Sequence, residues 1–138
     1  MKTLKQLLFA FTLLTMSASS SAVDATDQGT QTRISEKGLY HVTVTSWLKP
    51  LRLGRMHAWE ANVTTADGKP VTDAEIKVGG GMPIHNHGFP TQPEATKQIK
   101  DGVYLIEGVK FSMRGPWLLF LDITSNNKTD SVAFDINM

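Results

Sequence analysis

The feature that most constrains the fold is a period of two in the apolar residues, which recurs in short segments of the chain. Tyr40, Val42 and Val44 alternate with polar residues, and residues 57–63 and 132–136 repeat the pattern. Successive side chains of an extended chain point to opposite faces, so such segments predict strands with one buried face. No amphipathic helical pattern of useful length accompanies them. We therefore expect an all-β fold.

Turn signals separate the expected strands, and the glycine run at residues 79–81 is expected to end the third of them. The spacing favours an immunoglobulin-like β-sandwich of about seven strands, with a small β-barrel as the alternative. The core is expected to include Trp59, Phe111 and Trp117. The expected extended segments are residues 40–45, 56–64, 74–78, 94–100, 103–107, 109–113, 117–123 and 132–136.

The N-terminus predicts an export signal. Lys2 and Lys5 precede an apolar run at residues 7–16, which is too short to span a bilayer and suits a signal peptide. Small residues follow, and we expect cleavage after Ala22, which would leave a periplasmic or secreted protein without a membrane span. The expected organisation is a signal peptide at residues 1–22, a flexible tether at residues 23–37 and a single domain at residues 38–138.

Charge and cysteine content exclude several classes of function. Lys and Arg total 14 while Asp and Glu total 13, a balance that gives no basic footprint for nucleic acid. Cysteine is absent, so disulfides, thiolate metal sites and cysteine nucleophiles are excluded. Neither a Gly-x-Ser-x-Gly elbow nor a pair of catalytic carboxylates is evident. We expect a binding protein rather than an enzyme.

The densest chemistry lies in the segment Met-Pro-Ile-His-Asn-His-Gly that starts at Met82. In an extended segment, His85 and His87 would point the same way and offer two imidazoles to one ion. Met113 lies on a later segment that a sandwich can bring to the same loop. Imidazole suits copper, zinc and nickel, whereas thioether selects Cu(I). The pattern predicts a copper site of His85, His87, Met82 and Met113, with His57 as a further candidate.

A structural role for the same residues stays open. A His-x-His pair can fix a loop by bonding backbone carbonyls, and Met82 and Met113 can be core packing, because methionine fills irregular gaps. His57 shares a strand face with Trp59, which favours a satisfied core histidine at that position. The alternative function is therefore a non-catalytic envelope interaction module, in which the histidine loop is structural and the sandwich docks through a strand edge or a loop face.

Several motifs occur in a fixed order between His57 and Trp117. The most specific are Met-Pro-x-His-x-His-Gly at residues 82–88 and Phe-x-Met-x-Gly-x-Trp at residues 111–117. With them come His57-Ala58-Trp59, Asp67-Gly68-Lys69-Pro70-Val71, Pro90-Thr91-Gln92-Pro93 and Asp101-Gly102-Val103-Tyr104. This stretch resembles the YtkA-like family of secreted bacterial domains, which borders on the FixH-like proteins.

The resemblance implies an immunoglobulin-type sandwich, in agreement with the strand pattern. FixH-like relatives are linked to copper-transporting assemblies that serve cytochrome oxidase maturation. This link implies copper as the bound ion and a metal acceptor or another envelope protein as the partner. Those relatives usually keep a membrane helix, whereas this chain has a signal that we expect to be cleaved. The expected function is copper handling in the periplasm.

Overall fold

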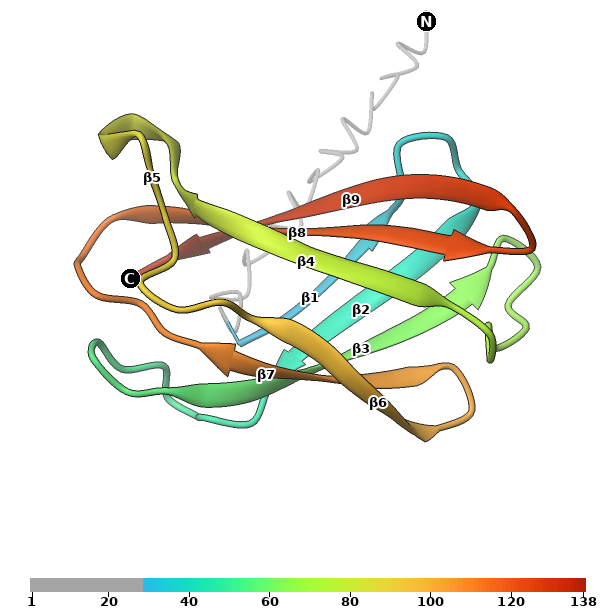
Figure 1. Cartoon of the computed structure of the whole chain (residues 1–138), viewed down its shortest axis with the longest axis horizontal. Coiled ribbons are helices and arrows are strands. Elements are labelled where there is room, and N and C mark those ends of the chain that lie inside the picture. The colour runs from blue at the N-terminus through green and yellow to red at the C-terminus, as the bar shows by residue number, and fades with distance from the viewer. Residues whose placement is uncertain (1–28) are drawn as a thin grey trace, which may run out of the picture.

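Two antiparallel sheets pack face to face in the part of the chain that the structure, a computed structural model, describes, which is residues 29–138 (Figure 1). The sheets have the orders β1-β2-β3-β7-β6 and β5-β4-β8-β9. The element bounds are β1 Thr30–Ile34, β2 Tyr40–Ser46, β3 His57–Thr65, β4 Glu75–Met82, η1 Pro83–His85, β5 His87–Gly88, β6 Glu94–Lys100, β7 Val103–Val109, β8 Pro116–Ser125 and β9 Lys128–Asn137.

The β-sandwich prediction is confirmed, because the two sheets are separate and do not close into a barrel. The described residues form nine strands rather than about seven. The additional strands, β1 and β5, are short and largely polar or exposed, so apolar alternation could not reveal them. Of the extended segment expected at residues 109–113, only Val109 lies in a strand, and the rest belongs to the loop before β8. Among residues 29–138, no helix has the length and apolar character needed to cross a membrane.

The expectation of a flexible tether at residues 23–37 is wrong from residue 30 onward. There β1 pairs antiparallel with β2, from Thr30 opposite Thr45 to Ile34 opposite His41. Backbone bonds hold this strand, and they need no apolar side chains. On its other side, the Gln31 side-chain amide donates to the backbone carbonyl of Asp135 in β9 over 2.6 Å. Residues 23–28 and the expected signal peptide lie outside the described residues.

The prediction that the glycine run ends a strand is also wrong, because β4 continues through Gly79, Gly80 and Gly81 to Met82. A Cβ at Gly79 would overlap the ring of Phe120, which lies opposite on β8. A Cβ at Gly80 would overlap the backbone carbonyl of a β8 residue. A side chain at Gly79 would displace the partly exposed Phe120 ring, whereas one at Gly80 would meet the β8 backbone and force the two strands apart.

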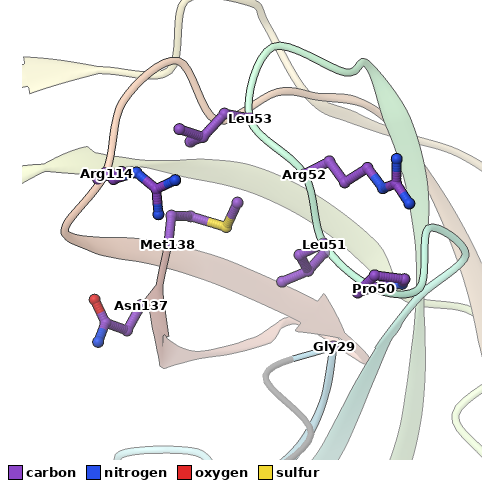
Figure 2. A pocket seen from close by; sticks show the side chains of 8 residues that line it. All are labelled: Gly29, Pro50, Leu51, Arg52, Leu53, Arg114, Asn137 and Met138. Atoms are coloured by element: carbon purple, nitrogen blue, oxygen red, sulfur yellow. The ribbon is translucent and has the colours of Figure 1, made fainter.

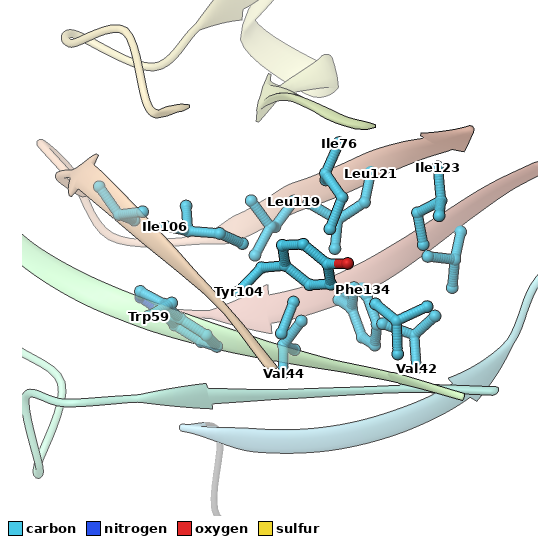
Figure 3. Packing of buried hydrophobic residues seen from close by; sticks show 14 of the residues in the cluster. Val42, Val44, Trp59, Ile76, Tyr104, Ile106, Leu119, Leu121, Ile123 and Phe134 are labelled. Atoms are coloured by element: carbon cyan, nitrogen blue, oxygen red, sulfur yellow. The ribbon is translucent and has the colours of Figure 1, made fainter. Parts of the chain in front are cut away.

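The core fills the space between the sheets (Figure 3). Buried and less buried residues alternate along β2, β8 and β9, as the period of two requires. Trp59 and Phe111 are 0% exposed and Trp117 is 1% exposed. Around them pack aliphatic and aromatic residues of both sheets, among them Val42, Val44, Ile76, Tyr104, Ile106, Leu119, Leu121, Ile123 and Phe134.

Tyr104 joins the two sheets where the chain crosses from one to the other. Its hydroxyl donates to the backbone carbonyl of Val71 over 2.7 Å and accepts from the backbone N–H of Ala74 over 2.9 Å. Burial raises the pKa of this phenol, which keeps the hydroxyl protonated and able to donate. The crossing segment is thereby fixed just before β4 begins, which sets the start of the strand that leads to the histidine loop.

The outer edge of the larger sheet is irregular. Pairing of β6 with β7 shifts register between Ala95 and Lys97 and again between Gln98 and Lys100. Nearly all side chains of β6 are exposed. Register shifts of this kind bend an edge strand and interrupt its row of free backbone groups.

Asp130 anchors the turn between β1 and β2. Its buried carboxylate accepts from the backbone N–H groups of Lys37, Leu39 and Ser131 over 2.9–3.2 Å. Burial opposes ionisation, but these bonds and one from the Ser35 hydroxyl outweigh it, so the pKa of Asp130 is lowered. The ionised carboxylate thus ties the turn to β9.

We expect Asp130→Asn to lower the free energy of unfolding by about 2 kcal/mol at neutral pH, because charged acceptors of backbone N–H groups are lost. The lowered pKa means that Asp130 stabilises the wild type fully above its ordinary value of 3.8 and loses this effect as the pH falls toward the lower folded value. Urea unfolding at neutral and acid pH measures both effects. A variant as stable as the wild type at neutral pH would contradict the assignment.

Candidate functional site

The histidine loop is a short hairpin that extends β4 beyond one end of the sandwich (Figure 1). Pro83 opens the single 3₁₀ turn η1, where its fixed φ suits a helical start. Asn86 then adopts the left-handed conformation, with φ 52° and ψ 42°, and its N–H donates to the carbonyl of Pro83 over 3.1 Å. Asparagine tolerates this conformation better than most residues. The chain thereby reverses within one residue and returns as β5.

His85 and His87 lie side by side, although the segment between them is not extended as expected. The turn at Asn86 brings the two rings together with centroids 6.0 Å apart and planes only 17° from parallel. A metal–nitrogen bond of about 2 Å puts a ring centre roughly 3 Å from the ion, so two rings on one ion have centres about 5–6 Å apart. Both histidines are exposed. The spacing suits two imidazoles that share one ion, but the stacked rings do not aim their in-plane lone pairs at one point, so a shared ion requires one of these exposed side chains to rotate.

His87 is held in a defined orientation. Its Nδ1 lies 2.8 Å from the carbonyl of Gly88, and since a carbonyl only accepts, Nδ1 carries the proton. Nε2 then keeps its lone pair. The ring also stands edge-on to Trp117, with centroids 5.6 Å apart and an angle of 69°. Metal-binding histidines commonly donate their second N–H to a carbonyl in this way.

The structure separates the two candidate methionines by their exposure. Met82 is opposite His87 in the β4–β5 pair, but its side chain is 0% exposed and packs in the core. Met113 is 41% exposed, and its carbonyl accepts from the indole N–H of Trp117 over 3.0 Å. Trp117 thus contacts His87 with its ring and Met113 through its N–H. Of the two methionines, only Met113 has an exposed side chain, and its link to Trp117 is made by its backbone carbonyl and not by its thioether.

His57 lies away from the pair, and both of its ring nitrogens are occupied. The indole N–H of Trp59 can only donate, so Nε2 of His57 accepts it over 2.8 Å. Nδ1 then carries the proton and donates to the carbonyl of Arg55 over 2.9 Å. Burial lowers the pKa of His57, while the Arg55 carbonyl bond partly opposes that shift. This neutral, fully bonded ring packs on Phe111, with centroids 5.7 Å apart.

An aromatic cluster of Trp59, Phe89, Phe111 and Trp117 supports the histidine loop, because its Trp117 ring contacts His87. The sequence pattern did not predict Phe89 as a member. Phe89 stacks on Trp117, with centroids 5.6 Å apart and planes 13° from parallel, and also contacts Phe111 at 5.9 Å. Phe111 in turn contacts Trp59 and Trp117. The only signal for Phe89 was a large aromatic residue between Gly88 and Pro90 in an otherwise small or polar loop.

The comparison with known protein families matches residues 49–121 to the YtkA-like family, which is more than half of the chain. The chain belongs to the YtkA-like family. The matched residues of this YtkA-like domain run from the loop before β3 into β8 and include every candidate residue described above. No curated protein and no solved structure matches the chain. Among residues 29–138, no group of three or more His, Asp or Glu residues is placed to hold a metal ion.

We expect Gly80→Ala to unfold or strongly destabilise the domain, by about 3 kcal/mol or more. The residue has φ +145°, which side-chain-bearing residues rarely adopt, and its Cβ would overlap the carbonyl of Leu118. Gly88→Ala is the matched control, because its Cβ would meet only the carbonyl of Gly80, at 3.5 Å. Chemical unfolding compares the two variants. Equal stabilities would show that the close approach of β4 and β8 does not need glycine.

We expect His57 to make the domain less stable in mild acid. Because the folded pKa is below the ordinary 6.5, the unfolded chain takes up the proton more readily. The stabilising effect is complete above that value and declines as the pH falls toward the folded pKa. Melting temperatures measured from about pH 7 to about pH 5.5 should fall less in His57→Gln than in the wild type. His41→Gln, a control at the other end of the sandwich, should follow the wild type, and a decline as steep in His57→Gln would refute the assignment.

Proposed function

We propose that this YtkA-like domain is an exported, periplasmic copper-handling protein that binds the ion through His85 and His87. The observation that carries the proposal is the pair of exposed imidazoles with centroids 6.0 Å apart, close enough for both to reach one ion after rotation of one side chain. The Gly88 carbonyl holds the His87 proton on Nδ1 and leaves Nε2 for the ion. The YtkA-like family and the signal-like N-terminus support the extracytoplasmic setting.

Copper is favoured over a harder cation by the donors near the pair. Imidazole binds copper, zinc and nickel, and a thioether shifts the preference toward Cu(I). Met113 offers an exposed thioether on the residue whose backbone carbonyl accepts from Trp117, and Trp117 contacts His87. Met82 is fully buried, so we assign it to core packing and not to the copper site. In this proposal copper is cargo that passes to an acceptor protein, and the domain catalyses no reaction.

The test is a Cu(I) titration of the purified protein against a competing chelator. We expect the wild type to bind one ion per chain and the double variant His85→Ala/His87→Ala to lose that binding. His41→Ala removes a histidine at the other end of the sandwich and should bind as the wild type does. The proposal is wrong if the double variant keeps the wild-type affinity.

The contribution of the thioether is tested by Met113→Leu. The substitution nearly conserves volume, so weaker Cu(I) binding with an unchanged melting temperature would assign Met113 as a ligand. Met56→Leu is the matched control, because Met56 is also exposed but lies before β3. An effect of the same size in both variants would remove Met113 from the proposed site.

The alternative is an envelope interaction module in which the histidines are structural. A groove of about 310 Å³ beside the loop favours it, because Leu118, Phe120 and Pro83 line the groove together with His87. The same double variant separates the two functions. If the histidines serve copper binding, the free energy of unfolding of the metal-free double variant should fall by less than about 1 kcal/mol, because both rings are exposed. A large drop in the melting temperature of metal-free protein would favour the structural role.

A further inference from the structure

One end of the sandwich is rich in basic residues, although the Glu60 carboxylate also reaches it and accepts from the indole N–H of Trp47. Three segments meet at this end: the loop at residues 47–56 before β3, the loop at residues 110–115 before β8, and the histidine hairpin (Figure 1). A backbone bond from Gly54 to Phe111 joins the first two loops over 2.8 Å. The two loops contain no Asp or Glu. Their basic residues are Lys49, Arg52, Arg55, Lys110 and Arg114.

Most of this charge is not neutralised within the domain. Arg52, Arg55 and Arg114 are exposed and form no ion pair with another residue of the described part of the chain. The turns at the opposite end mix acids with bases, as in the ion pair of Asp67 with Lys69. The domain is therefore electrically polarised along its length, although the whole chain is nearly neutral.

Large apolar side chains stand exposed at the tips of the same three segments. Met56 is 65% exposed, Ile84 68%, Met113 41% and Leu53 36%. Exposed apolar residues next to arginine and lysine are typical of a surface that enters the headgroup region of an anionic bilayer.

A cavity of about 540 Å³ opens at this end between the loops and the last strand (Figure 2). Arg52 and Arg114 line it from different loops, and Leu51, Leu53 and Met138 provide apolar walls. The volume lies in the range of sites that hold a small amphipathic ligand. A phosphate group at the mouth would be matched in charge by Arg114, whereas the Arg52 guanidinium is directed away from Met138 (Figure 2).

The chain also enters the domain at this end. Gly29 lines the same cavity, and its carbonyl accepts from the N–H of Ser46 over 2.6 Å. The attachment point of the residues before Gly29 therefore lies on the basic end and not on the mixed-charge end.

We propose that the basic end docks onto an anionic phospholipid surface, with the apolar tips in the headgroup region and the arginines on lipid phosphates. Lipid is favoured over an acidic protein because large apolar side chains are exposed on the same segments as the arginines, a composition that suits the headgroup region of an anionic bilayer. Lys and Arg residues near such a surface each add to binding, and salt screens the attraction. The proposal does not depend on copper, although it would turn His85 and His87 toward the membrane.

The test is flotation of metal-free protein with vesicles of phosphatidylglycerol and phosphatidylcholine, and with vesicles of phosphatidylcholine alone. The protein is purified after export, with one verified N-terminus for every variant. We expect binding to the anionic vesicles only, with release at high salt. Arg52→Gln/Arg55→Gln/Arg114→Gln should weaken binding by roughly 100-fold.

Matched variants keep the result interpretable. Lys69→Gln/Lys100→Gln/Lys128→Gln removes the same charge from the opposite end and should bind as the wild type does. Exchange of the three arginines for lysine should preserve binding, because the attraction is one of charge. Met56→Ser/Ile84→Ser should weaken binding while the charge stays constant. Melting temperatures establish that each variant is folded.

Three results would overturn the proposal. Wild-type protein that fails to float with anionic vesicles is the first, and equal binding by the arginine triple variant is the second. The third is arginine-dependent binding to polyglutamate with no binding to vesicles, which would identify an acidic protein as the partner. Since all arms use metal-free protein, none of these outcomes depends on whether the domain binds copper.

Discussion

Phe111 is the residue on which the functional end of the domain depends. It belongs to no strand, yet it is fully buried and contacts Trp59, Phe89 and Trp117. These residues come from both sheets and from the loop after β5. Aromatic pairs of this kind each add about 0.5–1.5 kcal/mol beyond the area they bury. Phe111 thus closes the open end of the sandwich and gives Trp117 a fixed surface on which His87 stands.

The second requirement is the run of three glycines in β4, Gly79 to Gly81. Gly79 makes room for Phe120, while Gly80 and Gly81 let the backbone approach β8 and β5. With larger residues the strand would separate from β8 before reaching Met82. The histidine hairpin would then lose the strand that presents it. Residues without any chemical function therefore determine where the imidazoles are.

The sequence predicts most of the strands, including the exposed β6, which was expected at residues 94–100. Alternating apolar residues identify β2, β3 and β9. The sequence did not predict β1, because backbone hydrogen bonds hold this polar strand. It predicted too early an end for β4, because a glycine can indicate either a turn or a close approach of two strands. The pairing of His85 with His87 was expected from an extended segment, whereas a left-handed Asn86 produces it. The burial of Met82 and the role of Phe89 depend on tertiary packing, which spacing along the chain does not encode.

The irregular edge at β6 has a consequence for how the protein behaves when it is concentrated. A regular edge strand is a template on which another chain can grow a sheet, and it is the usual starting point of fibre formation. The two register shifts of β6 break that template, and the contacts of Gln31 with β9 engage the strand at the other edge of the same sheet. Self-association by strand addition is therefore suppressed on this sheet. The larger sheet thus offers no regular edge on which a second copy of the chain could add a strand.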